Sequence, residues 1–360
     1  MDLLFLSDLF INGFRNLESV SVHPTERFNV ISGKNGSGKT NFLEAVYFFS
    51  TLRSFRTVFR KEIVGDGCEH AVLKGLFGGA AAGLKLDIEL GIDLRKIKKN
   101  DKELSAVDDH FSLLPMVLFH PANMSLLQGG PKDRRRYMDR ALFQAERRYP
   151  SLLSDYNRVL LSRNRLLKNR CTDKSLLHPF DVQLASLGSN IVSSRRSFIE
   201  KAGPIFREAI NEIGQGIEGD MFYRPDTEGD VDVFLSVFEK SFKRDSDRGF
   251  SSRGPHADEL EIFVNGRPAK KFSSQGQQRM AVLSLKVAEV MTLSNVTHRI
   301  PILLLDDISS ELDRDRNRAL FTFLNGVGGQ VFITTTHVDH VLLSDSRKDF
   351  KIDGGCLVEF

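Results

Sequence analysis

Residues 33–40 read GKNGSGKT, and this segment constrains the fold of the chain more than any other. The pattern is that of a phosphate-binding loop, in which glycines let backbone N–H groups face the phosphates while the lysine and threonine supply a cation and a Mg²⁺ ligand. Such a loop requires a strand before it and a helix after it. An apolar segment ending at Ser32 and the apolar periodicity of residues 41–51 predict both elements. The expected ATP-binding residues are Gly33, Lys34, Asn35, Gly36, Ser37, Gly38, Lys39 and Thr40.

Residues 302–307 read ILLLDD, which is four apolar side chains followed by two carboxylates. This pattern predicts a buried strand that delivers acids to its C-terminal end, where ligands bind in open α/β sheets. Asp306 is expected to hold Mg²⁺ together with Thr40, and Asp307 to accept a proton from the attacking water or to orient it. Two solvated turn aspartates are the alternative, which the phosphate loop disfavours. We therefore predict an ATPase with ATP and Mg²⁺ as cofactors and Asp307 as its catalytic residue.

Three later segments resemble motifs of ABC-type ATPases, in the order in which that class carries them. SSQGQQR at 273–279 is similar to the signature, in which a serine and a glycine open a helix. In that class the signature binds the γ-phosphate held by the other protomer, so the resemblance implies an ATP-dependent homodimer. The residues implied are Ser273, Ser274, Gln275, Gly276 and Gln277 for the signature acting in trans, Ser310 and Asp313 for the D-loop, and Thr336 or His337 for the switch.

The middle of the chain differs in pattern from its two ends. Short apolar and alternating segments at the ends are typical of strands, whereas the middle carries two long runs of helical periodicity, the first with Ser151 as a candidate cap. The predicted fold class is α/β, an ABC-type P-loop ATPase head with an inserted α-helical arm domain. The expected domains are the first half of the ATPase domain at 1–112, the helical arm at 113–255 and the second half of the ATPase domain at 256–360.

Segments along almost the whole chain resemble the RecF family of DNA-repair ATPases. This resemblance implies an ATP-dependent DNA-binding protein of recombinational repair and replication that acts at single-strand/double-strand gap junctions. It also implies RecR and RecO as partners in loading RecA, and weak, DNA-stimulated ATP hydrolysis that drives release. The segments are NGFRNL at 12–17, LFHPANMSLLQGGPKDRRRYMD at 118–139, YNRVLLSRNRLLK at 156–168, GPHADEL at 254–260, SSQGQQR at 273–279 and LLLDDISSELD at 303–313.

Some positions of the resemblance stay open. Ala257 stands where the family usually has arginine, and Phe55 stands where it usually has histidine. Arg15 and Asn16 resemble residues that lie near the nucleotide in SMC-like heads, with a surface turn as the alternative. The candidates for the Q-loop residue of the class are His120, Asn123 and Gln128.

Positive charge is concentrated in one part of the chain. Residues 131–196 hold 15 Lys and Arg against 6 Asp and Glu, a net charge of +9, whereas the whole chain is only +3. Such a stretch favours a DNA-binding face, because basic groups release condensed counterions from phosphates. A solvated helix surface is the alternative for any single residue, and the absence of a base-reading motif predicts sequence-independent binding. The candidate DNA contacts are Arg134, Arg135, Arg136, Arg163, Arg165, Lys168 and Arg170.

Other readings of the phosphate loop explain less of the sequence. No apolar run approaches the ~20 residues that span a bilayer, so we expect a cytoplasmic, nucleoid-associated protein with no membrane partner. A kinase or another P-loop ATPase needs the loop but not the signature or the basic stretch. An SMC-like structural ATPase needs a coiled coil far longer than the expected arm.

Overall fold

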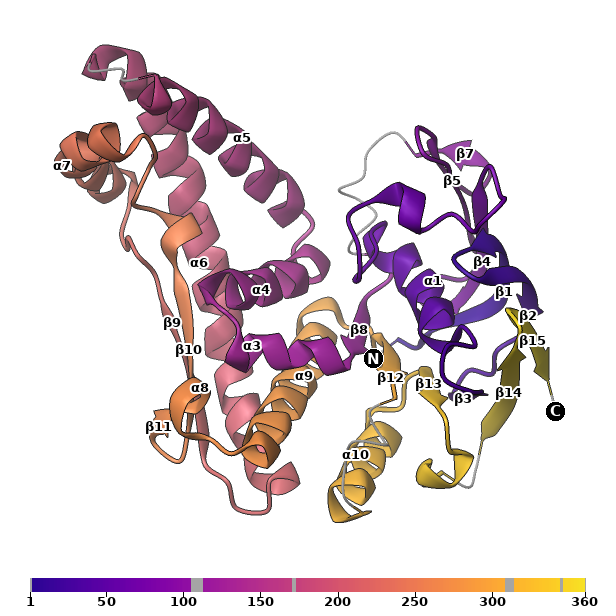
Figure 1. Ribbon diagram of the computed structural model, residues 1–360. Coiled ribbons are helices and arrows are strands. Elements are labelled where there is room, and N and C mark those ends of the chain that lie inside the picture. Colours follow the sequence, from indigo (N-terminus) through magenta and orange to yellow (C-terminus); the bar gives the residue numbers. More distant parts are fainter. Residues whose placement is uncertain (1, 105–112, 170–172, 308–313, 344–345, 360) are drawn as a thin grey trace. The chain divides into compact units, whose positions relative to one another are not determined.

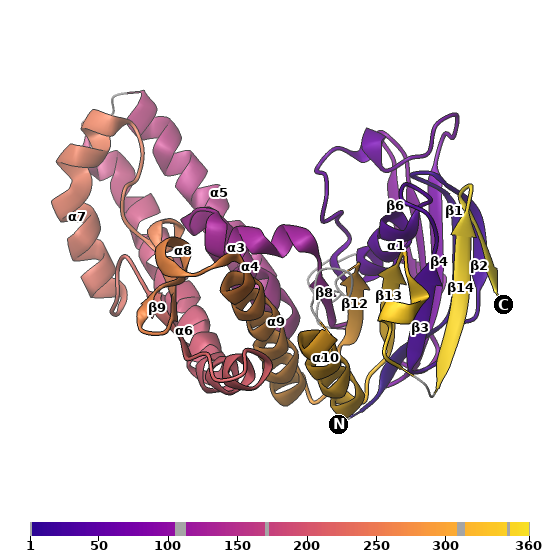
Figure 2. The same cartoon turned by 60° about the horizontal axis from the view of Figure 1, so that its bottom comes forward.

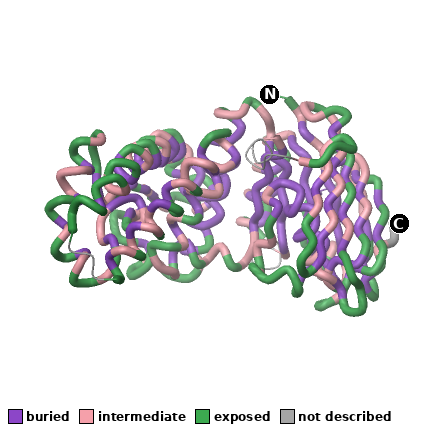
Figure 3. Tube along the Cα trace, turned by 90° about the horizontal axis from the view of Figure 1, so that it is seen from above, coloured by how far each residue is buried: buried purple, intermediate pink, exposed green. Residues whose placement is uncertain are grey.

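In the computed structural model, the chain forms two compact units (Figure 1). The second unit is inserted in the sequence of the first, and each has its own buried interior (Figure 3). The structure describes residues 2–104, 113–169, 173–307, 314–343 and 346–359. Unit 1 comprises Met1–Asn123, Glu212–Gly214 and Glu289–Phe360, and unit 2 comprises Met124–Asn211 and Gln215–Ala288.

These units do not coincide with the predicted domains 1–112, 113–255 and 256–360. Strand β8 (Met116–Phe119) pairs with β12 in the central sheet and therefore belongs to unit 1. The hairpin of β10 (Glu259–Val264) and β11 (Arg267–Pro268) and the start of α9 (Gln275–Thr297) belong to unit 2, because their apolar residues pack into its core. Both boundaries therefore lie further along the chain than the change in sequence pattern suggested.

The central sheet of unit 1 has the strand order β15-β14-β3-β13-β12-β8. Strands β14, β3, β13, β12 and β8 run parallel, and the mainly apolar sequences of β3, β13, β12 and β8 fit a sheet covered on both faces. Every residue of β3, β8, β12 and β13 is buried. The bounds are Phe28–Ser32 for β3, Met116–Phe119 for β8, Ile302–Asp306 for β12, Val331–Thr335 for β13, Arg347–Asp353 for β14 and Cys356–Glu359 for β15.

A second, antiparallel sheet of unit 1 has the order β2-β1-β4-β5-β6-β7. Helix α1 (Lys39–Thr51) packs against strands of both sheets (Figure 2). Its predicted apolar face, Phe42, Ala45, Val46 and Phe49, is buried as expected. The remaining elements are β1 (Leu4–Phe14), β2 (Leu17–Val22), β4 (Ala71–Gly79), β5 (Leu84–Leu90), β6 (Arg95–Lys99), β7 (Lys102–Glu103), α10 (Arg314–Val327) and the 3-10 helices η1 (Arg60–Glu62), η2 (Pro121–Met124) and η5 (Val338–His340).

Unit 2 is built on long helices beside a small antiparallel sheet of order β11-β10-β9. The longest, α6, has 40 residues and extends about 60 Å at 1.5 Å per residue. The predicted cap at Ser151 is wrong, because α5 begins at Tyr149, with Arg148 as its N-cap and Pro150 in its first turn. The elements are α3 (Ser125–Gln128), α4 (Pro131–Ala145), α5 (Tyr149–Lys168), α6 (Lys174–Ile213), β9 (Gly219–Arg224), α7 (Val231–Arg248), η3 (Pro255–Ala257), β10 (Glu259–Val264), β11 (Arg267–Pro268), α8 (Ala269–Phe272) and the first part of α9 (Gln275–Thr297), up to Ala288.

Helix α9 combines length with apolar composition. Over the residues that the structure describes, it alone could cross a membrane by these two criteria, with a mean hydropathy of 1.2 in its most apolar window. However, 78% of that window is buried inside the protein. This burial fits a core helix, so α9 gives no support to a membrane partner.

Candidate nucleotide-binding site

The loop between β3 and α1 has the backbone that its glycines permit. Gly36 and Gly38 have φ values of 80° and 116°, in the left-handed region that side chains disfavour. A Cβ atom on Gly38 would lie 2.9 Å from Asn16 Oδ1, and one on Gly33 would lie 2.5 Å from the Ile352 carbonyl oxygen. The last two residues of the loop, Lys39 and Thr40, begin α1, where helix N–H groups favour an anion. The structure thus places residues 33–40 as a phosphate loop requires.

Lys39 lies over this loop. Its ammonium nitrogen donates to the carbonyl oxygens of Gly33 at 2.8 Å and Lys34 at 2.9 Å, and the side chain is largely buried. Burial lowers the pKa of Lys39 from its ordinary value, while the charges of Asp307 and Asp306 oppose that shift. The two carboxylates therefore help to keep a cation beside the loop.

The Thr40 hydroxyl and the Asp306 carboxylate meet at the C-terminal ends of the parallel strands. Thr40 Oγ1 lies 2.9 Å from Asp306 Oδ1 and 3.1 Å from Oδ2, although the residues are 266 positions apart. A hydroxyl and a carboxylate are the oxygen ligands that Mg²⁺ prefers, with phosphates and water completing its shell. No cluster of three or more acidic, His or Cys side chains suited to a metal occurs in the described ranges, so a cation here would need those further ligands. These residues fit a nucleotide-bound Mg²⁺.

The Ser37 hydroxyl gives a second indication that a ligand completes the loop. Its oxygen is buried and has no hydrogen-bond partner among the residues that the structure describes. Buried hydroxyls in folded proteins are normally hydrogen-bonded. A phosphate oxygen within the loop would supply the partner that Ser37 lacks.

Asp307 follows directly after β12 in a strained backbone conformation. Its φ of 51° is left-handed, which is uncommon for a residue with a side chain and tends to occur at functional sites. Its N–H lies 3.1 Å from Thr334 Oγ1 and 3.2 Å from the Thr334 carbonyl oxygen on β13. Thr334 Oγ1 also lies 2.8 Å from Asp306 Oδ1. Thr334 was missed from the sequence, because only the pairing of β12 with β13 brings it to both acids.

Of the three candidates for the Q-loop position, His120 lies beside Asp306. His120 Nε2 lies 3.3 Å from Asp306 Oδ2, and the Ala122 N–H donates to Nδ1 at 3.0 Å. Because Nδ1 accepts a hydrogen bond, the neutral ring carries its proton on Nε2 and donates toward Asp306. Phe55, unusual for its position, stacks edge-on to this ring at 5.1 Å.

The other two candidates have different partners. The Asn123 side chain accepts the backbone N–H of His120 at 2.8 Å and so shapes the turn after β8. Gln128 belongs to unit 2, where its amide donates to Gln278 at 3.1 Å. His120 is consequently the best placed of the three toward the expected cation.

Arg15 and Asn16 lie in the turn between β1 and β2. Arg15 forms two hydrogen bonds with the buried Glu44 carboxylate, at 2.7 and 3.1 Å. The Asn16 amide donates to the Gly36 carbonyl oxygen at 3.2 Å and therefore touches the phosphate loop. Glu44, which sequence reasoning did not single out, thus ties Arg15 to α1.

The signature segment begins α9 in unit 2. The Ser274 N–H donates to Gln277 Oε1 at 2.9 Å, and the Gln277 N–H donates to Ser274 Oγ at 3.3 Å. This reciprocal pair is a capping box, and it leaves Ser274 and Gln275 exposed at the helix N-terminus. Ser273 and Gly276 are partly buried beside them. The geometry suits an anion approaching from outside the chain.

The remaining ABC-type assignments have less structural support. Thr336 is partly buried and His337 is exposed after β13, and the Thr335 hydroxyl bonds the backbone of His337. The D-loop residues Ser310 and Asp313 lie outside the described residues, so their assignment stays a prediction.

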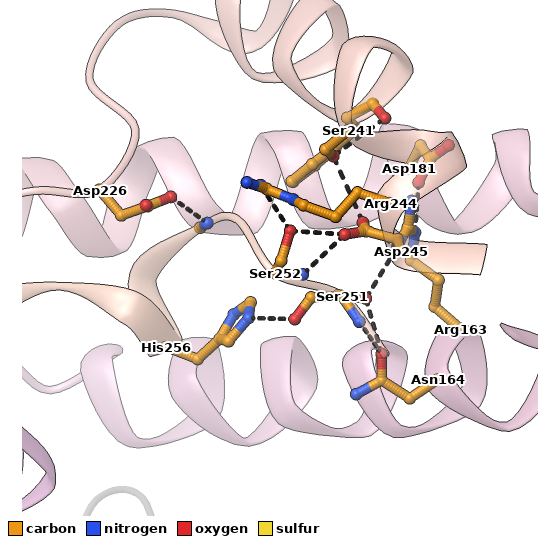
Figure 4. A network of polar contacts seen from close by, with 12 residues as sticks. Arg163, Asn164, Asp181, Asp226, Ser241, Arg244, Asp245, Ser251, Ser252 and His256 are labelled. Carbon is orange, nitrogen blue, oxygen red and sulfur yellow. Dashed lines mark hydrogen bonds and ion pairs between the residues drawn. The ribbon is translucent and has the colours of Figure 1, made fainter. Parts of the chain in front are cut away.

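Arg163 is not a surface residue, which corrects its assignment as a DNA contact. Its side chain is 1% exposed and pairs with Asp181 at 2.6 Å and Asp245 at 3.1 Å. Its guanidinium also donates to Ser251 Oγ at 2.8 Å. Figure 4 shows Arg163 beside Asp181 of α6, Asp245 of α7 and Ser251 of the segment after α7. A buried cation with two carboxylate partners holds helices together and cannot also reach DNA phosphates.

Arg134 is likewise engaged inside unit 2. It forms a bidentate pair with Glu259, at 2.7 and 2.8 Å, and donates to two backbone carbonyl oxygens. Arg135 is partly buried and donates to the Asp258 carbonyl oxygen at 2.7 Å. The exposed candidates within the described ranges are Arg136, Arg165 and Lys168. Arg170 lies outside the described residues.

A second buried arginine, Arg195, organises the middle of unit 2. It is 2% exposed and pairs with Asp139 at 2.8 Å and Asp258 at 2.7 Å. Burial raises the pKa of Asp258, while Arg195 and a hydrogen bond from Tyr223 oppose this shift. This network was not predicted from the sequence, because its members come from α4, α6, β9 and the residue between η3 and β10.

Comparisons with known proteins agree with this geometry. The family described as RecF/RecN/SMC N terminal domain matches residues 5–352. The DNA replication and repair protein RecF of Geotalea daltonii is 35% identical over 360 residues, covering 97% of this chain and 98% of that protein. The Myxococcus xanthus protein of the same name is 37% identical over 343 residues, covering 91% and 90%.

Solved structures extend the comparison to the fold. The recombination mediator protein RecF bound to ATP in the RecFOR pathway has a TM-score of 0.91 and 30% identity, covering 99% of this chain and 98% of that chain. An Smc head domain from Pyrococcus furiosus, with a TM-score of 0.58 and 14% identity, is similar in fold alone.

Proposed function

The chain belongs to the RecF family of DNA replication and repair proteins, and on this premise we propose that it acts as an ATP-driven switch on DNA. The observation that carries this proposal is the meeting of Thr40 and Asp306 at 2.9 Å beside Lys39. These are the groups that a phosphate loop needs to hold a nucleotide and its cation.

The division of labour at the site follows from these positions. Backbone N–H groups of residues 33–40 and the Lys39 ammonium bind the phosphates, while Thr40 and Asp306 would hold Mg²⁺. When bound, Mg²⁺ neutralises charge that develops on the phosphoryl oxygens. Asp307 orients the attacking water or accepts its proton. ATP hydrolysis is weak and DNA-stimulated, and its slow rate sets how long the protein stays on DNA.

The nucleotide also controls assembly. The exposed capping box at Ser274 offers helix N–H groups to the γ-phosphate held by a second copy of the chain. ATP therefore favours a homodimer through contacts that exist only in the paired state. Loss of the γ-phosphate removes those contacts and opens the dimer.

DNA is the substrate on which the dimer acts. The exposed cations Arg136, Arg165 and Lys168 support sequence-independent contacts with phosphates. Within the family, binding at single-strand/double-strand junctions with RecR and RecO, and loading of RecA, follow from this role. We extend these properties to the chain as part of the proposal.

Light scattering with and without ATP and gapped DNA tests this function. We expect wild-type protein to dimerise with ATP and Mg²⁺ and to enlarge further on gapped DNA. Lys39→Ala removes charge-assisted contacts of about 1.5–3 kcal/mol each, so it should weaken ATP binding by at least about tenfold and abolish the dimer. Lys351→Ala, an exposed lysine on β14, is the matched control. An ATP-induced dimer of the Lys39→Ala variant as strong as that of wild type would refute the nucleotide argument.

A further inference from the structure

Thr334 contacts the two acids of the site from a neighbouring strand. It is fully buried on β13, which pairs in parallel with β12 so that Thr334 lies opposite Asp306. Its Oγ1 lies 2.8 Å from Asp306 Oδ1 and 3.1 Å from the Asp307 nitrogen. One hydroxyl therefore contacts both the expected cation ligand and the backbone of the expected catalytic residue.

The direction of these hydrogen bonds is fixed by chemistry. The Asp307 N–H can only donate, so Thr334 Oγ1 accepts there. The hydroxyl has one hydrogen, and Asp306 Oδ1 at 2.8 Å is a closer acceptor than the Leu305 carbonyl oxygen at 3.4 Å. The result is a chain from the Asp307 N–H through the Thr334 hydroxyl to the Asp306 carboxylate.

We propose that Thr334 is a positioning residue that sets both carboxylates for MgATP. Its bond to Oδ1 fixes the rotation of the Asp306 carboxylate, so that the remaining lone pairs face Thr40 and the cation. Its bond from the Asp307 N–H, which the Thr334 carbonyl oxygen shares at 3.2 Å, helps to hold the left-handed backbone of Asp307, with φ of 51°. This inference rests on the proposed ATP site and adds a residue to it.

An ordinary buried threonine would not produce this arrangement. β-branched residues suit strands, and burial alone requires only that the hydroxyl find some acceptor. The adjacent Thr335 is equally buried, yet its hydroxyl bonds the backbone of His337. The Thr334 hydroxyl instead lies closer to the Asp306 carboxylate, at 2.8 Å, than to the Leu305 carbonyl oxygen of the neighbouring strand, at 3.4 Å.

The test compares Thr334→Val, which keeps the shape and removes the hydroxyl, with Thr334→Ser, which keeps the hydroxyl and removes a methyl group. Thr292→Val is the matched control. Thr292 is buried in α9, and its hydroxyl has no hydrogen-bond partner in the part of the chain that the structure describes. The thermal unfolding midpoint of each variant is measured first, and it should lie within a few degrees of the wild-type value.

Two measurements then distinguish a role of Thr334 in positioning the carboxylates from a role in packing alone. Electron paramagnetic resonance follows Mn²⁺ binding in the presence of a non-hydrolysable ATP analogue, and fluorescence titration follows binding of the same analogue in EDTA. Groups that orient a metal ligand typically contribute 10- to 100-fold to metal affinity, so Thr334→Val should weaken Mn²⁺ binding by about that factor. Thr334→Ser should recover most of the loss, and analogue binding in EDTA should stay unchanged.

Other outcomes overturn the inference. Wild-type Mn²⁺ affinity in Thr334→Val would show that the hydroxyl does not set the carboxylates. Equal losses with Mn²⁺ and in EDTA, or no recovery in Thr334→Ser, would assign the effect to packing. If wild-type protein bound neither the analogue nor Mn²⁺, the proposed function itself would fail, which is a different result from either of these.

Discussion

Two groups of buried charges in this molecule place a cation near carboxylates for opposite purposes. In unit 1, Lys39, Thr40 and Asp306 gather where parallel strands end, and within the described residues Lys39 donates to loop carbonyl oxygens and not to a carboxylate. In unit 2, Arg163 and Arg195 each pair with two carboxylates inside the helical core. In the first arrangement the cation can still bind an anionic ligand. In the second, the arginine charges are neutralised by carboxylates of the protein itself. The hydrogen-bond and ion-pair partners of a buried cation therefore distinguish a ligand-binding role from a structural one, whereas its burial and the number of nearby charges do not.

This difference predicts how the two regions respond to mutation. Changes at the site should alter catalysis and nucleotide binding while leaving the fold intact. Changes in the helical core should alter the free energy of unfolding, because a carboxylate that loses its arginine stays buried without a counter-charge.

The largest effect should come from Asp307→Asn. Removing a proton acceptor from hydrolysis typically slows it by about 10²- to 10⁴-fold, and the ATP-bound dimer should persist correspondingly longer. The thermal midpoint should stay near that of wild type. Steady-state phosphate release and dimer lifetime by light scattering check this expectation. Asp315→Asn, a 70% exposed acid at the start of α10, is the control. Turnover at the wild-type rate would remove Asp307 from its catalytic role.

The next largest effect is on stability in unit 2. Arg195→Gln leaves Asp139 and Asp258 without their arginine and should lower the free energy of unfolding by about 3–5 kcal/mol. Arg158→Gln removes an exposed ion pair and should change it by less than about 1 kcal/mol. Urea unfolding of both variants measures the difference. A loss for Arg195→Gln as small as that for Arg158→Gln would mean that the network does not hold the core.

A smaller effect, on DNA binding, is expected from the exposed cations of α5, Arg165 and Lys168, which lie on the same helix as the buried Arg163. Arg165→Gln/Lys168→Gln should preserve folding and weaken DNA binding, with a salt dependence shallower by about 1.8 in log–log slope if both residues contact duplex phosphates. Fluorescence anisotropy of gapped DNA across a salt series gives this slope. Arg318→Gln, 63% exposed on α10, is the matched surface control. An unchanged slope would place the DNA contacts elsewhere.

The sequence predicted the site better than the scaffold, for a physical reason. Phosphate and cation binding impose residue types on contiguous segments, so GKNGSGKT and ILLLDD could be interpreted without knowing the fold. The partners of Arg163 come from α6 and α7, 18 and 82 positions along the chain, and only helix packing brings them together. Thr334 was missed for the same reason, since strand register alone places it against Asp306. Counting the charges of residues 131–196 therefore overestimated the number of cations available to DNA, because buried arginines such as Arg163 were included.

The smallest expected effect concerns His256, which is held neutral in the scaffold of unit 2. Its Nδ1 contacts the Tyr156 hydroxyl at 2.8 Å and its Nε2 contacts the Ser251 carbonyl oxygen at 2.9 Å. Burial lowers the pKa of His256, and Arg135 adds to that shift, while the Ser251 bond, Asp226 and Asp258 oppose it.

A depressed histidine pKa fixes the sign of the pH dependence. Below about pH 6.5 the unfolded chain binds a proton that the folded chain resists, so stability falls as the pH drops from there through the folded pKa. His256→Gln keeps an amide donor for Ser251 and removes the titration. Relative to this variant, wild type should lose stability on acidification, as measured by urea unfolding between pH 7.5 and 5.5. If the free energies of unfolding of wild type and His256→Gln changed equally with pH, the folded protein would tolerate a charged His256. The polar groups around His256 would then be able to stabilise an added charge, as the site in unit 1 is expected to do.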